Sequence, residues 1–375
     1  MLIRLLYLGA VPISPDQSGG SVVLWRHQQL FSGGAISSAD PGLGFRAGLG
    51  LALWNGLRRL RLGRLALIFH PRLRQLDLNF SPAELASLGN QADAILTVAH
   101  GLTWLQAMVA ARACGLPLIT VVHDWYPDAS GCPHWGLWIW DQSFRRLMRR
   151  SALIFAVSDG MAKQIGPHPN LHVLPPIPDP ALKPCPPRRL HRGPWRLYYS
   201  GLCGGLYRPL LQQLIEAVAA DPRFVLHISG PGYQELLLPD ALSCVRCSGF
   251  LHGDAWQQAF DEADALVLVL SFERRHRRHL ATHFPSKLVE YANRGRPIVI
   301  WGPSWSTAVQ WGQGKPQVLI HTSTSRTCLI EAICGWLPEQ PASTFPDKAL
   351  SANQLRWQFE LAVAQLLKHN NPPLT

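Results

Sequence analysis

Short runs of hydrophobic residues recur along the chain and predict buried β-strands. In the first half of the sequence the runs are Leu2–Leu8, Leu65–Phe69, Ala94–Val98, Leu118–Val122 and Leu153–Val157. Uninterrupted Val, Ile and Leu, bounded by polar residues, Gly or Pro, are typical of parallel strands that are covered on both faces. The segments between the runs, such as residues 101–114, have the periodicity and length of helices. The pattern therefore predicts a doubly wound α/β arrangement.

This alternation breaks between residues 174 and 195, where proline is dense and no periodicity remains. We expect an extended, semi-rigid linker there. Beyond it, strands resume at Arg196–Tyr199, Phe224–Ile228, Ala265–Leu270 and Pro297–Trp301. The predicted division is a first α/β domain over residues 1–175, a linker over 176–195 and a second α/β domain over 196–350. Residues 351–375 form a C-terminal amphipathic helix and tail that we expect to pack toward the first domain.

Length and composition agree with two globular domains. The chain has 375 residues, and this length is more than one hydrophobic core usually spans. Of these residues, 47% are hydrophobic and 16% are charged. The apolar runs stop far short of the roughly 20 residues that a membrane span needs, and the start lacks a secretory cleavage site. We therefore expect a cytoplasmic protein. The eight cysteines are scattered; only Cys244 and Cys247 have metal-like spacing, without a second pair, so ordinary reduced thiols are expected.

The charge balance indicates an anionic partner. Lys and Arg number 35 and Asp and Glu 24, which gives a net charge of +11. Nucleic acid, an acidic membrane face and phosphorylated small molecules all fit such a charge. Residues 43–64 interleave apolar side chains with arginines, and residues 132–140 (CPHWGLWIW) hold three tryptophans. These segments either lie on an anionic membrane surface, at the inner face of the membrane, or pack internally with their arginines in water; both interpretations stay open.

Candidate chemistry gathers in the loops that follow the predicted strands, because open α/β sheets bind ligands at the carboxyl ends of their strands. Gly19 and Gly20 open a helix after the first strand, where bare backbone could approach a phosphate. His123 and Asp124 end the strand Leu118–Val122, where an imidazole and a carboxylate could act on a sugar hydroxyl or a phosphate. The alternative for His123 is a structural cap.

The second predicted domain repeats this arrangement. Gly201 and the cation Arg208 follow its first strand, and Gly230 and Gly232 follow the next. Each loop alone is an ordinary strand-to-helix turn. Their recurrence at successive strand ends indicates a site for a ligand that backbone can approach closely.

A third loop in this half reads THFPSKLVEYANRGRP, residues 282–297. We predict Ser286 as the N-cap of a short helix, Lys287–Asn293, that Gly295 closes. Its first N–H groups and Lys287 could hold a diphosphate. Glu290 lies four residues beyond Ser286 on the same helix face, at a distance that suits the ribose hydroxyls of a nucleotide.

The order and spacing of these pieces resemble the GT-B-fold, retaining nucleotide-sugar glycosyltransferases. This large family includes bacterial polysaccharide and lipopolysaccharide sugar transferases (glycosyltransferase family 4-like). The similarity covers most of the chain, from the first glycine loop through VVHDWYPD, FAVSDGM, LYYSGLCGG and HISGPGY to GFLHGDAWQQAFDEADALVLVL and FPSKLVEYANRGRPIV. It implies two Rossmann-like doubly wound domains facing a central cleft, with the acceptor bound by the first domain and the nucleotide sugar by the second.

The resemblance also implies roles for individual residues. Glu290 matches the acid that binds the ribose, and Arg208 and Lys287 match positions near the leaving diphosphate. His123 matches a histidine near donor sugar and acceptor, with Asp124 beside it, so both are candidate catalytic residues that orient and polarise. Gly19, Gly20, Gly201, Gly230, Gly232 and Ser286 complete the predicted donor-nucleotide site.

Two departures from the family pattern bear on the donor sugar. Relatives often carry a second acid eight residues before the ribose-binding one, and Thr282 stands there; Thr282, His283 and Phe284 are the candidate donor-sugar residues. The lysine usually paired with Arg208 is absent from the loop that carries it, and the basic run at residues 274–279 could compensate.

The resemblance implies transfer of a sugar from a nucleoside-diphosphate sugar to a glycan or lipid-linked acceptor with retention. By the same resemblance, the reaction needs neither a metal nor another cofactor. No Asp-x-Asp metal motif occurs in the sequence. A non-catalytic relative that binds a nucleotide sugar or a partner enzyme is the alternative, supported by Thr282. A sugar-nucleotide epimerase would want more converging acid–base candidates. A nucleic-acid-binding protein is suggested by charge alone, and no recognition helix or aromatic RNA-binding signature supports it, so we expect no nucleic-acid partner.

Overall fold

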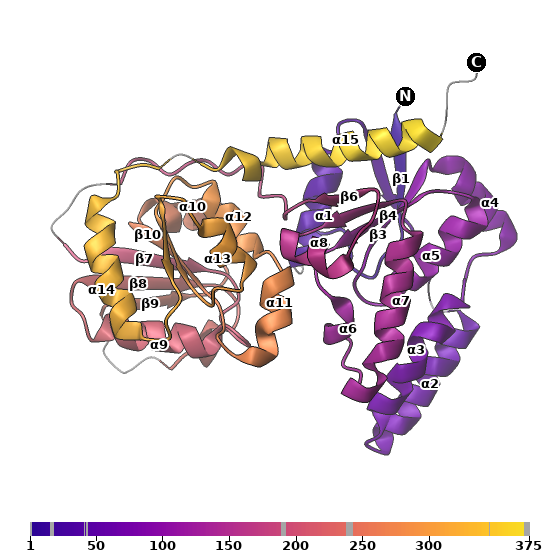
Figure 1. Ribbon diagram of the computed structural model, residues 1–375, viewed down its shortest axis with the longest axis horizontal. Coiled ribbons are helices and arrows are strands. Elements are labelled where there is room, and N and C mark those ends of the chain that lie inside the picture. Colours follow the sequence, from indigo (N-terminus) through magenta and orange to yellow (C-terminus); the bar gives the residue numbers. More distant parts are fainter. Residues whose placement is uncertain are drawn as a thin grey trace. The chain divides into compact units, whose positions relative to one another are not determined.

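The computed structural model describes residues 2–15, 19–40, 42, 44–188, 193–237, 243–344 and 346–370. The chain divides into two compact units (Figure 1). The first consists of Met1–Ile177 with Asn353–Thr375, and the second of Pro178–Ala352. Each unit is built on a six-stranded parallel sheet with helices on both of its faces. The predicted α/β, doubly wound fold class is confirmed.

The first sheet has the strand order β2-β1-β3-β4-β5-β6. Its strands are β1 (Ile3–Tyr7), β2 (Gly34–Ser38), β3 (Ala94–Val98), β4 (Leu118–Val122), β5 (Leu153–Ala156) and β6 (Leu171–Val173). Every residue of β3, β4 and β5 is buried, which explains their uninterrupted apolar runs. The strand order reverses between β1 and β3, so the carboxyl ends of these two strands form the usual ligand-binding position of this unit.

The helices of the first unit cover both faces of this sheet. They are α1 (Gly19–Leu30), α2 (Phe45–Arg59), α3 (Gly63–Gln75), α4 (Pro82–Gln91), α5 (Thr103–Cys114), α6 (Tyr126–Ala129), α7 (Leu137–Arg150), α8 (Asp159–Ile165) and α15 (Ala352–Asn370).

The predicted strand Leu65–Phe69 is wrong, because these residues lie inside α3. The apolar run is too short to distinguish a strand from a helix by itself. In the structure Ala66, Ile68 and Pro71 are buried while Phe69 is exposed, a helical pattern that the packing of α3 against α2, α5 and α7 stabilises.

The second sheet has the order β12-β11-β10-β7-β8-β9. Its strands are β7 (Trp195–Ser200), β8 (Phe224–Ser229), β9 (Val245–Ser248), β10 (Ala265–Val269), β11 (Ile298–Trp301) and β12 (Val318–His321). Four of them, β7, β8, β10 and β11, lie within a residue of their predicted positions. The order reverses between β7 and β10, and the loops at the carboxyl ends of these strands carry the residues considered below.

Helices of the second unit alternate with these strands. They are α9 (Arg208–Ala219), α10 (Gly253–Asp261), α11 (Arg277–Thr282), α12 (Ser286–Ala292), α13 (Thr307–Gly312) and α14 (Arg326–Trp336).

The described part of the proline-rich segment, up to Arg188, is tied to the second unit by backbone and arginine hydrogen bonds. The Cys185 N–H donates to the Arg294 carbonyl at 2.8 Å, and the fully buried Arg296 donates to the Pro186 carbonyl at 2.6 Å. Arg188 is also buried, and its guanidinium donates to the Leu337 carbonyl at 2.9 Å. These bonds compensate the loss of backbone partners that proline causes. Residues 189–192 of the predicted linker lie outside the described residues.

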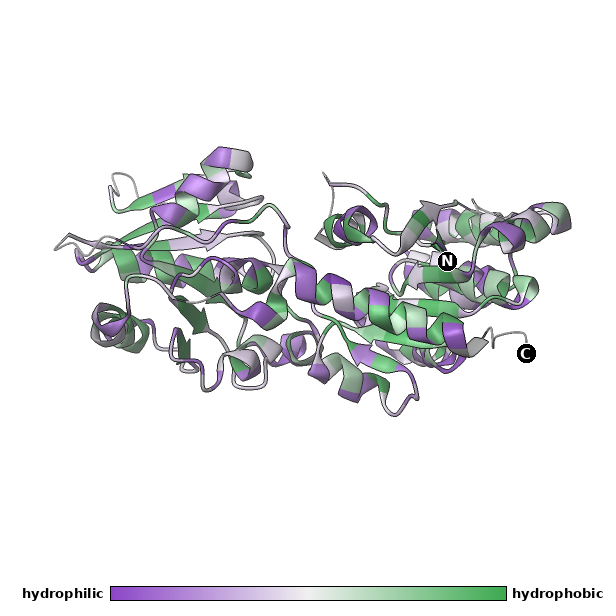
Figure 2. Cartoon of the chain, turned by 90° about the horizontal axis from the view of Figure 1, so that it is seen from above, coloured by the Kyte–Doolittle hydropathy of each residue, from purple (hydrophilic) through white to green (hydrophobic). Residues whose placement is uncertain are grey.

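The terminal helix α15 belongs to the first unit. In Figure 2 both hydrophobic and hydrophilic residues occur along this helix, as expected for a helix with one apolar and one polar face. Phe359 is buried against Phe155 and Phe31, with ring centroids 5.0 and 5.8 Å apart, and against His27 of α1 at 4.8 Å. Among the described helices none has the length and apolar character that spanning a bilayer requires.

Candidate functional site

Three glycines meet at the carboxyl ends of β7 and β8 in the second unit. Gly201, Gly230 and Gly232 all have positive φ angles, of 134°, 137° and 83°. A Cβ on Gly230 would lie 2.0 Å from the Gly201 carbonyl oxygen, and one on Gly232 would lie 3.0 Å from the Gly204 nitrogen. Backbone therefore packs directly on backbone here, which only glycine allows. The sequence-predicted glycines of this unit are brought together.

Side chains from two helices fix the loop that begins at Ser200. The Ser200 N–H donates to the hydroxyl of Tyr291 on α12 at 2.8 Å, and the indole of Trp256 on α10 donates to the Ser200 hydroxyl at 3.2 Å. Further along the loop, the Cys203 N–H donates to the Pro231 carbonyl at 2.9 Å, which joins it to the glycine turn after β8. These three hydrogen bonds fix the conformation of the loop without a ligand.

The amine of Lys287 reaches into this loop from α12. Its nitrogen lies 4.2 Å from the ring centre of Tyr199 and 4.0 Å from that of Tyr207, and it donates a hydrogen bond to the Tyr199 hydroxyl. A Cβ on Gly201 would lie 3.0 Å from this nitrogen, so glycine leaves room for it. Burial of the amine between the two rings lowers the pKa of Lys287 to about 7.

Glu290 lies on the same helix and is 8% exposed. Its carboxylate accepts a hydrogen bond from the Asp179 N–H at 3.4 Å. Arg294, fully buried, has its guanidinium over the rings of Trp256 and Phe260 at 4.9 and 4.2 Å. Burial lowers the pKa of Arg294, and the Glu290 carboxylate is one of the charges that oppose this shift. The Glu290 carboxylate therefore has the buried Arg294 guanidinium as a neighbouring positive charge.

One detail of the predicted helix is wrong. The helix α12 covers Ser286–Ala292, within one residue of the prediction, but its N-cap is Pro285 and Ser286 already has helical geometry without a capping bond. Proline at 285 fixes the extended backbone conformation that a cap residue needs, so the serine side chain is not required. The hydroxyl of Ser286 stays at the exposed start of the helix. Gly295, predicted to close the helix, has the left-handed φ of 69°.

Arg208 is the first residue of α9, next to Tyr207. Its guanidinium lies 3.5 Å from the carboxylate of Glu235, and both side chains are about half exposed. An exposed ion pair of this kind contributes little to stability, so Arg208 can exchange Glu235 for an anionic ligand at small cost.

The three candidate donor-sugar residues differ in what they present. Thr282 is buried, and its hydroxyl donates to the Arg278 carbonyl at 2.9 Å within α11. Phe284 is buried as well. His283 is half-buried and its ring stacks on His279 at 4.9 Å. His283 is therefore the member of this group with the clearest access to a ligand.

The remaining predicted residues lie in the first unit. His123 and Asp124 follow β4 directly and are half-buried. His123 lies near the buried His27 and contributes, after burial, to the lowering of the pKa of His27 to about 3. Gly19 and Gly20 form the first turn of α1, and residues 16–18 before them lie outside the described residues. The predicted site residues are thus divided between the two units.

Sequence reasoning missed the aromatic residues of this site. Tyr199 and Tyr207 enclose the lysine, and Trp256 and Tyr291 hold the loop. Tyr199 ends a predicted strand, where an aromatic residue is expected as core, so its position gave no signal. Tyr207 directly precedes the predicted Arg208 in the sequence, and this position could have indicated that Tyr207 belongs to the site.

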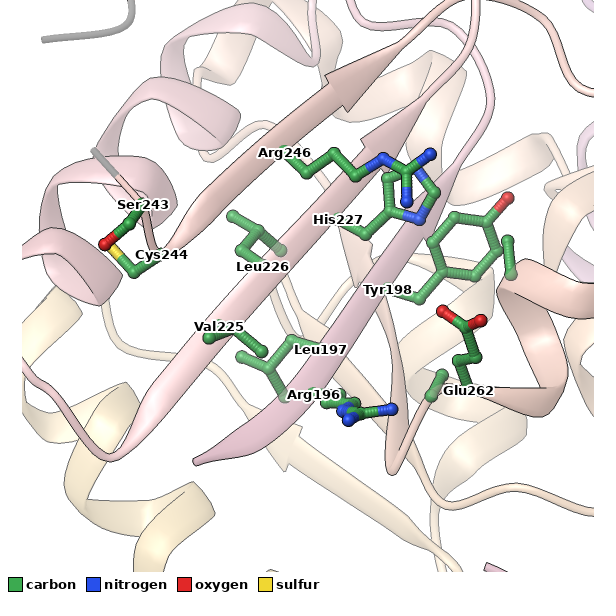
Figure 3. A pocket seen from close by; sticks show the side chains of 12 residues that line it. Arg196, Leu197, Tyr198, Val225, Leu226, His227, Ser243, Cys244, Arg246 and Glu262 are labelled. Carbon is green, nitrogen blue, oxygen red and sulfur yellow. The ribbon is translucent and has the colours of Figure 1, made fainter. Parts of the chain in front are cut away.

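A separate cavity of about 350 Å³ opens on the second sheet (Figure 3). Its lining includes Arg196 and Tyr198 of β7, His227 of β8, Arg246 of β9 and Glu262 after α10. Figure 3 shows the side chains of His227, Tyr198 and Arg246 close together at one end. Because these residues precede the carboxyl ends of their strands, the cavity is distinct from the glycine loops.

Part of the chain resembles a known protein family. Residues 39–182 match the model of Glycosyltransferase Family 4. A search of curated proteins returns no significant match.

Solved structures of similar fold cover nearly the whole chain. The apo form of the lipopolysaccharide outer core galactosyltransferase WaaB has 14% identity and a TM-score of 0.61, over 97% of this chain and 99% of that one. Anabaena HepE in complex with UDP and glucose has 14% identity and a TM-score of 0.60, over 98% and 100%. A glycosyltransferase from Rickettsia africae has 13% identity and a TM-score of 0.61, over 98% and 99%. At these identities the likeness is one of fold, and it confirms the predicted GT-B class.

Proposed function

We propose that this chain, a glycosyltransferase of the GT-B fold by its matched family segment and its architecture, uses a nucleoside-diphosphate sugar as donor. It transfers the sugar with retention, and without a metal, to a glycan or lipid-linked acceptor in polysaccharide or glycolipid synthesis. The observation that carries the proposal is the contact of the Lys287 amine with Gly201 at the end of β7, next to the point where the strand order reverses. Glu290 lies on the same helix as Lys287, Arg208 begins the helix that follows this loop, and Gly230 packs on Gly201 from the loop after β8. The UDP bound to HepE, a protein of similar fold, supports a nucleotide donor.

Each part of the donor would meet a different group. Glu290 would accept hydrogen bonds from the ribose hydroxyls, because an ionised carboxylate is an acceptor only. Lys287 and Arg208 would bind the diphosphate, while Gly201, Gly230 and Gly232 let backbone approach it. Gly19, Gly20 and Ser286 are further candidates for phosphate contacts, and His283, with Thr282 and Phe284 behind it, for the donor sugar.

The chemical step follows from the charge that develops on the leaving group. As the glycosidic bond to phosphate breaks, negative charge grows on the diphosphate, and Lys287 and Arg208 would stabilise it in place of a metal. For retention, the leaving phosphate oxygen takes the acceptor's proton on the face where the new bond forms. His123 and Asp124 would then orient the acceptor and polarise its hydroxyl.

The experiment that tests this function measures release of nucleoside diphosphate from UDP-, GDP- and ADP-sugars, with and without EDTA. The expected result is turnover of sugars of one base, unchanged by EDTA, and NMR of the product that shows the donor's anomeric configuration. An inverted product would overturn retention, and loss of turnover in EDTA would overturn metal independence.

A non-catalytic, nucleotide-sugar-binding relative is the second candidate. The observation that favours it is the Thr282 hydroxyl, which is bonded inside α11 where many relatives carry an acid toward the donor sugar. Stabilisation of the protein by a nucleotide sugar, with no release of diphosphate from any donor, would select this candidate.

We also propose that the first unit contacts an anionic membrane face, where a lipid-linked acceptor resides. The helices α2 and α3 pack side by side as a hairpin, and the Ala47 N–H at the start of α2 donates to Asp77 just after α3 at 2.8 Å. Residues 44–76 contain seven arginines and no acidic residue. Of the apolar side chains, Phe45 is 81% exposed, Leu60 69% and Phe69 55%.

Two tryptophans extend this surface. Trp135, in the 3-10 turn just before α7, is 64% exposed, and Trp138, in the first turn of α7, is 52% exposed; α7 packs against α3. Exposed Trp and Leu beside arginine are the composition of helices that lie in a membrane interface. We call the set of α2, α3 and residues 134–138 the arginine-rich hairpin surface.

A further inference from the structure

The amine of Lys287 lies against two aromatic rings and is partly buried, and among the residues that the structure describes no carboxylate pairs with it. Tyr199 presents its ring and hydroxyl from the end of β7, and Tyr207 presents its ring from the residue before α9. The Tyr199 hydroxyl donates to the Leu202 carbonyl at 2.6 Å, so its oxygen is left to accept from the lysine. The two rings and the loop between them therefore hold the amine in one place.

The titratable and charged groups around this amine are few. Tyr199, Cys203 and Tyr207 face it from β7 and the following loop, and of these only Cys203 acts to raise the pKa of the lysine. Arg208 and Glu235 on the flanking elements pair with each other. Among the described residues no carboxylate forms an ion pair with Lys287. Burial of the amine against the two rings lowers the pKa of Lys287 to about 7, and the Cys203 thiol opposes this shift.

We infer that binding of the donor's diphosphate is coupled to uptake of a proton by Lys287, and that Tyr199 and Tyr207 are positioning residues that hold the amine ready for it. The inference rests on the proposed function, because it concerns the same donor site.

The proton balance is simple. In the free protein near neutral pH a large share of the amines are uncharged, each with a lone pair on nitrogen. A diphosphate beside the nitrogen favours the ammonium form, which takes its proton from the buffer. The ammonium then has three N–H donors, one for the Tyr199 oxygen and two for phosphate oxygens. No bond other than N–H forms or breaks in this step.

This coupling would also compensate for the lysine that is absent from the loop of Arg208. The cation usually paired with Arg208 in the loop after β7 is missing, but Lys287 brings an amine to that loop from α12. Because Gly201 has no side chain, the amine can lie directly against the loop backbone. The second cation of the diphosphate site would thus come from a different element and acquire its charge only with the ligand.

The test is isothermal titration calorimetry of the whole chain at pH 8 with UDP, GDP and ADP, in buffers of different ionisation enthalpy. At pH 8 the nucleotide's terminal phosphate is already ionised, so it contributes few protons. With a pKa of about 7, roughly nine-tenths of the amines are neutral, and we expect uptake of about 0.9 proton per nucleotide bound.

Four variants distinguish coupling from a merely structural role. Lys287→Arg keeps the charge permanently, so it should bind with no proton uptake. Lys287→Met removes the charge at similar length, so it should bind at least tenfold more weakly, also without uptake. Tyr207→Leu opens the environment to water and raises the pKa of the lysine, so uptake at pH 8 should fall, whereas Tyr207→Phe keeps the ring and should retain it.

Three results would contradict the inference, and each has a different meaning. Nucleotide binding by the wild type with no proton uptake overturns the inference and leaves the proposed function standing. No binding of any nucleotide overturns the proposed donor site and the inference with it. Uptake that persists in Lys287→Arg assigns the proton to another group and also overturns the inference.

Discussion

At Gly230 the backbone leaves no space for a methyl group, and this allows a test of the glycine loops. A Cβ there would meet the Gly201 carbonyl at 2.0 Å, and φ is 137°. We expect Gly230→Ala to destabilise the second unit by about 2–4 kcal/mol and to abolish nucleotide binding, because the loop must move. The measurement is urea unfolding together with a nucleotide titration.

The neighbouring loop, which follows β7, offers a matched control at Gly205. Its φ is also positive, at 59°, but nothing lies within 4 Å of a Cβ there. Gly205→Ala should therefore cost only about 1 kcal/mol and preserve binding. Equal effects of the two substitutions would show that backbone strain, rather than the contact with Gly201, causes the loss of stability and of nucleotide binding.

Glu290 supports a second prediction at the residue scale. Glu290→Gln keeps the shape but replaces an ionised acceptor, so nucleotide affinity should fall by about 10- to 100-fold, the equivalent of about 1.5–3 kcal/mol for hydrogen bonds to a charged group. The measurement is a thermal-shift titration with UDP, GDP and ADP. Glu262→Gln, in the separate cavity of Figure 3, is the control and should bind as the wild type does. Unchanged affinity in Glu290→Gln would contradict the ribose assignment.

What the sequence could predict of the site depended on local geometry. Lys287 and Glu290 lie on one short helix whose spacing is visible in the sequence. The ring of Tyr207 reaches the amine across 80 residues of chain, a contact that the packing of β7, α9 and α12 creates and that no local pattern contains. The same holds for Asp179, whose N–H meets Glu290 111 residues away.

At the scale of elements, the unpredicted strands share one property. β2 and β6 form the edges of the first sheet, and β9 and β12 those of the second. Each is only partly buried. Polar residues interrupt β2, β6 and β9, and the apolar run of β12, Val318–Ile320, is too short to indicate a strand by periodicity alone. Edge strands are commonly short and partly polar, because an exposed apolar edge invites aggregation. Periodicity therefore reveals the middle of each sheet and misses its borders.

The packing of α15 on α1 leads to a prediction about pH. His27 is buried beside Phe359, and its pKa is lowered to about 3 by burial and by His123. Between pH 3 and 6.5 the unfolded chain binds a proton at this residue that the folded chain does not, so the unfolding free energy falls as the pH is lowered through this window. One such proton contributes at most about 1.4 kcal/mol per pH unit.

The variant His27→Leu isolates this contribution. It fills a similar volume and cannot titrate, so its unfolding free energy should depend less steeply on pH than that of the wild type between pH 6 and 4. The measurement is urea unfolding at several pH values, followed by a probe in the first unit. Identical slopes in the two proteins would contradict the prediction, whatever the absolute stability of the variant.

For the molecule as a whole, the distribution of charge matters more than the net value of +11. Seven arginines of residues 44–76 are not balanced by any acid in that segment, and six of them are exposed. The sequence indicated this interleaving of Arg and Leu but left open whether the apolar residues pack internally. The structure decides this for Phe45, Leu60 and Phe69, which are exposed, while Ala47 and Ile68 fill the interior of the hairpin. Net charge alone would not have separated a membrane from nucleic acid.

The last prediction concerns vesicle binding by the arginine-rich hairpin surface. The whole chain should co-sediment with vesicles that contain an anionic lipid, and not with neutral ones, and binding should weaken between 0.1 and 0.5 M salt because screening grows. Phe45→Ser with Leu60→Ser should weaken binding at least tenfold, since each inserted side chain contributes about 1.5–3 kcal/mol. Arg59→Gln with Arg61→Gln should also weaken it at least tenfold, at about 1 kcal/mol for each charge. Phe250→Ser, an exposed aromatic residue of the second unit, is the control and should bind normally. Equal binding to neutral and anionic vesicles would contradict the charge argument, and no binding to either would leave the hairpin without a membrane role.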